Sequence, residues 1–85
     1  MITINPFVVA KKQGAEFFLI LEDKVFHLQG IAKDIWDYVS ENENCSVEDI
    51  KSFILSEYDV NEKKVSKDIS KLIKQLEKED IISLG

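Results

Sequence analysis

Histidine and cysteine are the side chains best suited to catalysis or metal binding, and this chain has one of each, His27 and Cys45. A zinc site needs further nitrogen or sulfur ligands, and Cys45 has no second histidine nearby to act as its base. We therefore expect His27 to be a partly exposed strand residue and Cys45 a small loop or core residue. The three glycines are isolated, which excludes a glycine-rich phosphate loop. The sequence predicts no catalytic residue, no metal site and no cofactor.

The composition is that of a soluble globular domain with an acidic balance. The 85 residues are 45% hydrophobic and 32% charged, with a net charge of −5 and no arginine. Nonspecific nucleic-acid binding needs clustered lysine and arginine, so this balance argues against it. No apolar run approaches the length of a membrane span, and the first residues lack the basic start and apolar run of a signal peptide. A lone cysteine makes no internal disulfide, and we expect one cytoplasmic domain over residues 1–85.

The first part of the chain predicts a meander of three antiparallel strands, the last of which carries His27. Phe7–Ala10 favours a first strand, and Lys11–Gly14 favours the turn after it. Ala15–Leu21 is rich in aromatic and branched residues and predicts a second strand. Glu22-Asp23 is short enough for a two-residue hairpin loop, although it lacks the favoured glycine. Lys24–Leu28 then returns as the third strand.

Helical periodicity begins directly after the third strand and predicts three helices over the rest of the chain. The first helix carries Trp36 on its apolar stripe, where we expect it in the core, and ends in Glu41–Asn44. Ser46 is the predicted N-cap of the second helix. Asn61 is that of the third, which runs to about Asp80. The apolar tail is expected to pack back as an extended end. Three strands followed by three helices make an α+β domain.

The third predicted helix has two distinct faces. Ile73 lies at the margin of the apolar stripe, where it either completes the core or lines a groove beside the sheet. The basic stripe on the opposite side is either a solvated surface or a surface for an acidic partner. The apolar stripe is Val65, Ile69, Leu72, Ile73 and Leu76, and the basic stripe is Lys67, Lys71, Lys74 and Lys78.

The strand Lys24–Leu28 is expected to have an open edge. In a three-stranded meander the middle strand is paired on both sides, so the third strand keeps an unpaired row of N–H and C=O groups. This edge is either protected, with Lys24 and His27 blunting it, or used for β-augmentation, in which an extended peptide adds a fourth strand. In the second case a proline at Phe26 is expected to weaken binding by removing a donor from the edge.

In the order and spacing of several short sequence segments, the chain resembles the PqqD family (coenzyme PQQ synthesis protein D). This family is one of the RiPP recognition elements (RREs), which bind the precursors of ribosomally made, post-translationally modified peptides. The resemblance covers essentially the whole chain, and departs from the family at Gln29 and Ala32, where Asn and Gly are often found. It rests on the strands FFLIL and KVFHL, on Leu28-x₇-Trp36 with Ile35, on Ser46–Ile50, on Glu57–Val60, on Val65, Asp68, Ile69, Leu72 and Leu76, and on Ile81-Ile82.

The resemblance implies a winged-helix-like domain without catalytic activity. Such a domain holds the leader part of a precursor peptide as an added strand, in the cleft between its third strand and third helix. It presents that peptide to a modifying enzyme, often a radical S-adenosylmethionine (radical SAM) maturase. By position, the peptide-binding strand residues are Lys24, Val25, Phe26, His27 and Leu28, and the facing helix supplies some of Val65, Asp68, Ile69, Leu72 and Ile73.

Two classes of function are therefore compared. The first is a non-catalytic peptide chaperone for a precursor peptide and its modifying enzyme. The alternative is a winged-helix nucleic-acid-binding or transcription-regulator domain, whose affinity would fall steeply with added salt. The acidic balance disfavours the alternative. The precursor peptide, the product class and the modifying enzyme stay open, as does the choice between a monomer and a homodimer paired through the free edge.

Overall fold

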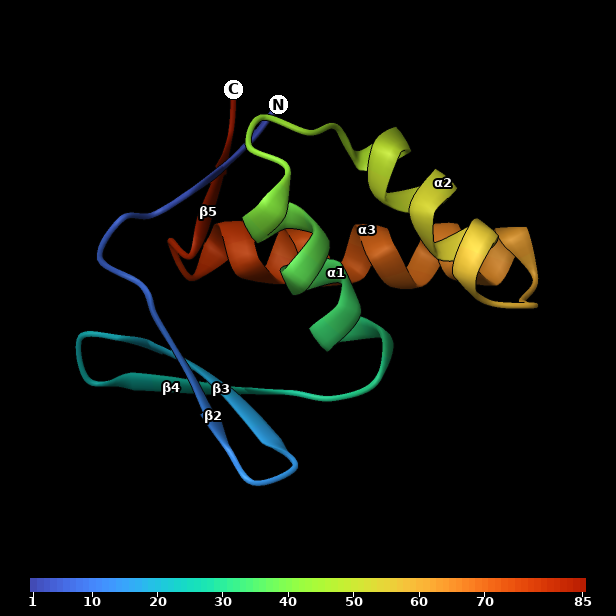
Figure 1. Cartoon of the computed structure of the whole chain (residues 1–85). Helices are drawn as coiled ribbons and strands as arrows, with labels where there is room; N and C mark the ends of the chain where they lie inside the picture. The colour runs from blue at the N-terminus through green and yellow to red at the C-terminus, as the bar shows by residue number, and fades with distance from the viewer.

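The chain folds into an α+β domain in which a three-stranded sheet lies beside three helices (Figure 1). The computed structural model describes all 85 residues. The antiparallel sheet has the order β2-β3-β4, and a second sheet pairs β1 with β5. The predicted class, three antiparallel strands followed by three helices, is confirmed. The elements are β1 (Ile2–Ile4), β2 (Val9–Gln13), β3 (Glu16–Leu21), β4 (Lys24–Leu28), α1 (Ile31–Glu41), α2 (Val47–Glu57), α3 (Glu62–Lys78) and β5 (Ile82–Leu84).

Strand β2 begins at Val9 rather than at Phe7, so the predicted bounds of the first meander strand were wrong. The prediction took Lys11–Gln13 for a turn because these residues are polar, but they pair with β3. The turn is instead a two-residue loop that starts at Gly14, whose φ of 62° suits glycine. All five β2 residues are exposed, so backbone pairing holds this strand and no apolar pattern marks it.

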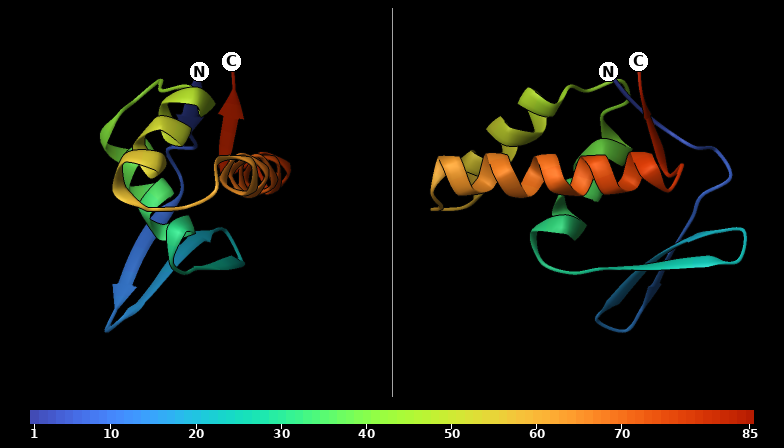
Figure 2. Two further views of the ribbon diagram at one scale, coloured as in Figure 1. Left: turned by 90° about the vertical axis from the view of Figure 1, so that its right-hand side faces the viewer. Right: turned by 180° about the vertical axis from the view of Figure 1, so that it is seen from behind.

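Strand β1 was not predicted at all. It pairs antiparallel with β5, with Ile2 opposite Leu84, so the two ends of the chain lie side by side (Figures 1 and 2). The predicted packing of the apolar tail as an extended end is confirmed, since Ile81 and Ile82 are buried. The partner of that tail comes from the opposite end of the chain, which no local pattern reveals.

The second and third helices begin at the predicted caps. The Ser46 hydroxyl accepts the N–H of Asp49 at 3.1 Å, and the Asp49 carboxylate accepts the N–H of Ser46 at 3.0 Å, which completes a capping box. The Asn61 side chain accepts the N–H of Lys64 at 3.1 Å. From its cap, α3 runs along one side of the molecule, with α1 and α2 together on the other side of it (Figure 2).

The core lies between the inner face of the sheet and the helices, and no polar or charged residue is buried in it. Trp36 is 5% exposed and belongs to this core, as predicted. Ile73 is 2% exposed, so of the two alternatives for this residue the core is the correct one. Cys45 lies between α1 and α2 and is buried, in agreement with its prediction as a small loop or core residue.

Candidate functional site

The hairpin turn between β3 and β4 determines which backbone groups of β4 are free. Glu22, the first loop residue, has a φ of 57°, and the second loop residue does not have a positive φ, which is the combination of a type II′ turn. A two-residue loop makes Leu21 and Lys24, which lie opposite each other, a hydrogen-bonded pair. Such pairs alternate along a ladder, so the N–H and C=O groups of Val25 and His27 point away from β3.

This register corrects the expectation for a proline at Phe26. Phe26 lies opposite Leu19, two positions along from the pair that flanks the turn, so its N–H faces β3 and not the open edge. A proline there would break the ladder that holds β4 in the sheet. The outward donors of the edge are the N–H groups of Val25 and His27.

A mostly apolar groove of about 300 Å³ lies beside the open edge of β4. This volume is at the lower end of the range for small-ligand pockets and suits one or two apolar side chains. Six of the eight lining residues are hydrophobic, and they come from β4, the start of α1 and the second half of α3. The lining residues are Val25, Phe26, His27, Leu28, Ala32, Leu72, Gln75 and Leu76.

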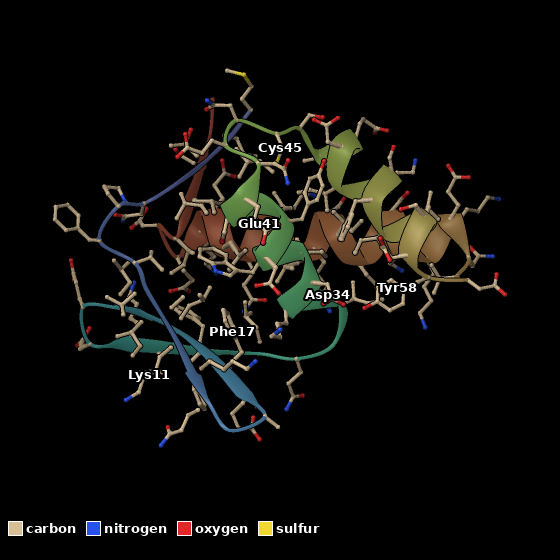
Figure 3. All side chains as sticks on the ribbon, viewed as in Figure 1. Lys11, Phe17, Asp34, Glu41, Cys45 and Tyr58 are labelled. Atoms are coloured by element: carbon tan, nitrogen blue, oxygen red, sulfur yellow. The ribbon has the colours of Figure 1, made fainter.

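The start of α1 is held in place by contacts to two other elements. The Lys33 ammonium lies 5.7 Å from the centroid of the Phe17 ring on β3, within cation–π range. The Tyr58 hydroxyl at the end of α2 donates to the Asp34 carboxylate, and Figure 3 shows these two side chains meeting between α1 and α2. Both contacts flank Ala32, the residue of α1 that lines the groove.

Of the five helical residues expected to include peptide contacts, the structure brings one into the groove. Leu72 is partly buried and lines it. Val65, Ile69 and Ile73 are 4%, 1% and 2% exposed and face the core, where they hold α3 against the rest of the domain. Asp68 is exposed and does not line the groove.

Sequence reasoning missed three lining residues of the groove. Gln75 follows Leu72 by one helical turn, so the spacing of three residues was a usable signal for it. Leu76 was assigned to the core alone, but it both packs in the core and reaches the groove. Ala32 lies at the start of the first helix, and nothing in the local pattern indicated that it faces a groove.

The side chains of β4 divide between its two faces. Lys24 lies on the inner side and its ammonium is 3.4 Å from the Glu79 carboxylate, an ion pair that connects β4 to the end of α3. His27 lies on the outer side, where it stacks on Phe18 with ring centroids 4.9 Å apart and pairs with Glu16. His27 is thus the partly exposed strand residue that the sequence predicted.

A larger hollow of about 470 Å³ lies between the two sheets, but its character is different. Only three of its ten lining residues are hydrophobic, and it opens beside β1, β5 and the β3–β4 turn. Ligand pockets are typically apolar with a few converging polar groups, and this hollow lacks the apolar lining. The groove beside β4 is the better candidate because it joins an apolar lining to free backbone groups.

The structure contains no group of three His, Cys, Asp or Glu side chains placed to hold a metal ion. The Cys45 thiol is buried, and burial together with the nearby Asp49 carboxylate raises its pKa above the ordinary value, which keeps it protonated. None of the helices combines the length and the hydrophobicity that a membrane crossing requires. What the site offers is backbone pairing and apolar contact.

Comparisons with known proteins agree with the fold. The model of the family "Coenzyme PQQ synthesis protein D (PqqD)" matches residues 16–82, from β3 to β5. TbiB1 in complex with the TbiA(beta) leader peptide is similar with a TM-score of 0.82 at 23% identity, over 95% of this chain and 94% of that chain. Lasso peptide synthetase B1 complexed with the leader peptide has a TM-score of 0.80 at 19% identity, over 98% of both chains. No protein with a curated description matches the sequence.

Proposed function

The chain belongs to the PqqD family, and from this premise we propose that it binds the leader part of a precursor peptide as a fourth strand on β4. The resemblance noted in the sequence is confirmed by the family match. The proposal is based on one observation: the unpaired edge of β4 has an apolar groove at its side. Main-chain hydrogen bonds supply affinity in β-augmentation, and side-chain pockets supply specificity.

The similar solved structures support this proposal. TbiB1 and lasso peptide synthetase B1 were both solved with a leader peptide, and both share the fold of this chain over nearly its full length. We propose that the peptide pairs with the backbone of Val25 and His27, and that its side chains contact Phe26, Leu28 and Leu72. Of the expected strand residues, Lys24 does not line the groove but faces the larger hollow between the sheets and pairs with Glu79, and Asp68 is exposed on α3 outside the groove.

We further propose that the domain is an adaptor rather than an enzyme. A groove with backbone donors and mostly apolar side chains can hold and orient a peptide, and its one basic side chain, His27, stacks on Phe18 and pairs with Glu16 on the outer face of the sheet. The chemistry then belongs to a separate modifying enzyme, often a radical SAM maturase in this family, to which the bound peptide is presented. A cytoplasmic location fits this role.

The proposal is tested by nuclear magnetic resonance with ¹⁵N-labelled protein. The ligand is a synthetic copy of any short peptide encoded beside the gene of this protein. We expect amide shifts at Val25 and His27 and along the groove side of α3, with Ala10 and Lys12 on the opposite edge strand β2 unmoved. Shifts on β2, or shifts confined to the exposed lysines of α3, would contradict β-augmentation at β4.

A further inference from the structure

The outward face of α3 carries six lysines and no acid. With about 100° between successive residues, the six side chains fall within a sector of about 100° that lies opposite the buried Val65, Ile69 and Ile73. The acids of the helix, Glu62, Asp68 and Glu77, fall outside this sector. We call this surface the lysine face; it consists of Lys63, Lys64, Lys67, Lys71, Lys74 and Lys78.

Helix stability does not explain the lysine face. All six side chains are exposed, and the four ion pairs of the structure involve other cations. Lys63, Lys67 and Lys71 follow one another at a spacing of four residues, as do Lys74 and Lys78, and like charges at this spacing destabilise a helix. The only basic residue that favours the helix dipole is Lys78 in the last turn.

The lysine face borders the proposed peptide groove along one side. Lys64, Lys71 and Lys78 recur every seven residues on the side of the helix nearest Gln75; Lys71 and Lys78 flank the groove residues of α3, and Lys64 continues the row about 12 Å before Leu72. We call these three the rim row. Lys63, Lys67 and Lys74 lie farther round the helix, away from the groove, and form the far row. Figure 2 shows the outer side of α3 free of any other element.

From this arrangement we infer the class of peptide that the domain binds, an inference that rests on the proposed function. We propose that the rim row binds acidic side chains of the peptide that lies in the groove. Neighbouring lysines of the row are about 10.5 Å apart along the helix, and an extended peptide rises about 3.3 Å per residue. Because only alternate side chains of an added strand share a face, the preferred peptide combines an apolar segment for the groove with Asp or Glu two or four residues apart.

Charge complementarity favours this occupant. The whole protein has a net charge of −5 and on balance repels an acidic peptide. At physiological ionic strength charges are screened beyond about 8 Å, so the local lysine face and not the net charge governs a peptide bound beside it. Asp68 is the one acid between Lys64 and Lys71 on the groove side, and it forms no ion pair with either.

The test begins with selection of binders from a library of short random peptides on the wild-type protein at physiological salt. Each selected peptide is then synthesised and titrated against three variants. The rim variant is Lys64→Gln/Lys71→Gln/Lys78→Gln, and its matched control, with the same change of charge on the same helix, is Lys63→Gln/Lys67→Gln/Lys74→Gln. Val25→Pro reports whether the peptide uses the β4 edge at all.

We expect the selected peptides to carry regularly spaced acids and to lose affinity roughly tenfold in the rim variant but less than about twofold in the far-row variant. Added salt should weaken wild-type binding more than binding to the rim variant. Peptides without acids that still depend on Val25 would overturn the inference and leave the proposed function standing. Peptides that bind regardless of Val25→Pro would overturn the proposed function itself. Equal losses in both lysine variants would mean that the whole lysine face attracts acidic groups, whether or not they lie beside the groove. That result would also overturn the assignment to the rim row.

Discussion

The sheet of this protein has two free edges, and they differ in what lies beside them. β2 forms one edge, and all of its residues are exposed; Lys11 extends away from the helices (Figure 3). β4 forms the other edge, and it lies beside the apolar groove that α1 and α3 complete. The same unpaired backbone is present twice in one sheet. An open edge becomes a selective site only where a second element supplies side-chain contacts next to it.

The difference follows from how each strand continues into the chain. β4 passes directly into α1, with the N–H of Ala32 donating to the carbonyl of Gln29 at 3.2 Å across the corner. Its inner residue Leu28 is buried, so the strand is held close to the helices. β2 instead reaches away from them with its hairpin turn (Figure 1), and its lysines make the exposed edge unattractive for pairing.

The largest expected effect comes from removing one outward donor of β4. Val25→Pro deletes an N–H that points away from β3 and leaves the β3–β4 ladder intact, and a lost main-chain hydrogen bond together with the bulk of the ring should lower peptide affinity about thirtyfold. Isothermal titration with a leader peptide measures this. The matched control is Ala10→Pro, which deletes an outward N–H of β2 and should leave affinity unchanged. Equal losses from both prolines would mean that the two edges do not differ in function.

The difference between the two edges was only partly visible in the sequence. The β3–β4 hairpin was predicted because aromatic and branched residues flank a two-residue turn, and the caps Ser46 and Asn61 were predicted because their side chains satisfy N–H groups locally. β2 was misplaced because a strand held by backbone pairing alone, with Lys11 and Lys12 in it, has the composition of a turn. The turn and the helix caps could be predicted from neighbouring residues, whereas the backbone pairing of the exposed strand β2 could not.

The groove wall shows the same limit on the helical side. A stripe pattern tells which residues face inward but not which neighbour they face. Ile73 and Leu72 are adjacent in the sequence, and only the packing of α3 against the sheet places Ile73 in the core and Leu72 in the groove. The pairing of β1 with β5 depends equally on the whole fold. The direction of each apolar side chain is thus a tertiary property.

A smaller effect is expected when the wall of the β4 groove is made polar. Leu72→Asp places a charge where the peptide's apolar side chain should pack and should lower affinity about tenfold, because the carboxylate must lose water on binding. Fluorescence anisotropy of a labelled leader peptide gives the ratio. Ser70→Asp, an exposed position on the same helix with the same change of charge, is the control and should change affinity by less than about twofold.

Thermal unfolding of both variants separates binding from folding. Leu72 is only partly buried, so its loss is expected to leave the domain folded. If Leu72→Asp binds as tightly as the wild type, α3 is not a wall of the site, and the β4 edge would then resemble the β2 edge in having backbone groups alone.

The smallest effect concerns the turns that set the two edges apart. The β2–β3 turn has Gly14 at a φ of 62°, whereas the β3–β4 turn has Glu22 at 57°, a conformation that costs a residue with a Cβ about 1 kcal/mol or more. Glu22→Gly removes this strain, and after the added flexibility of glycine in the unfolded chain a net gain of about 0.5 kcal/mol in unfolding free energy remains. Urea unfolding measures the gain. Asp23→Gly is the control; because that residue has no positive φ, the change should lower stability instead.

Peptide affinity should stay at the wild-type value in Glu22→Gly, since the two-residue loop and hence the outward direction of Val25 and His27 are unchanged. A changed affinity would mean that the register of β4 depends on the strained turn residue and not on loop length.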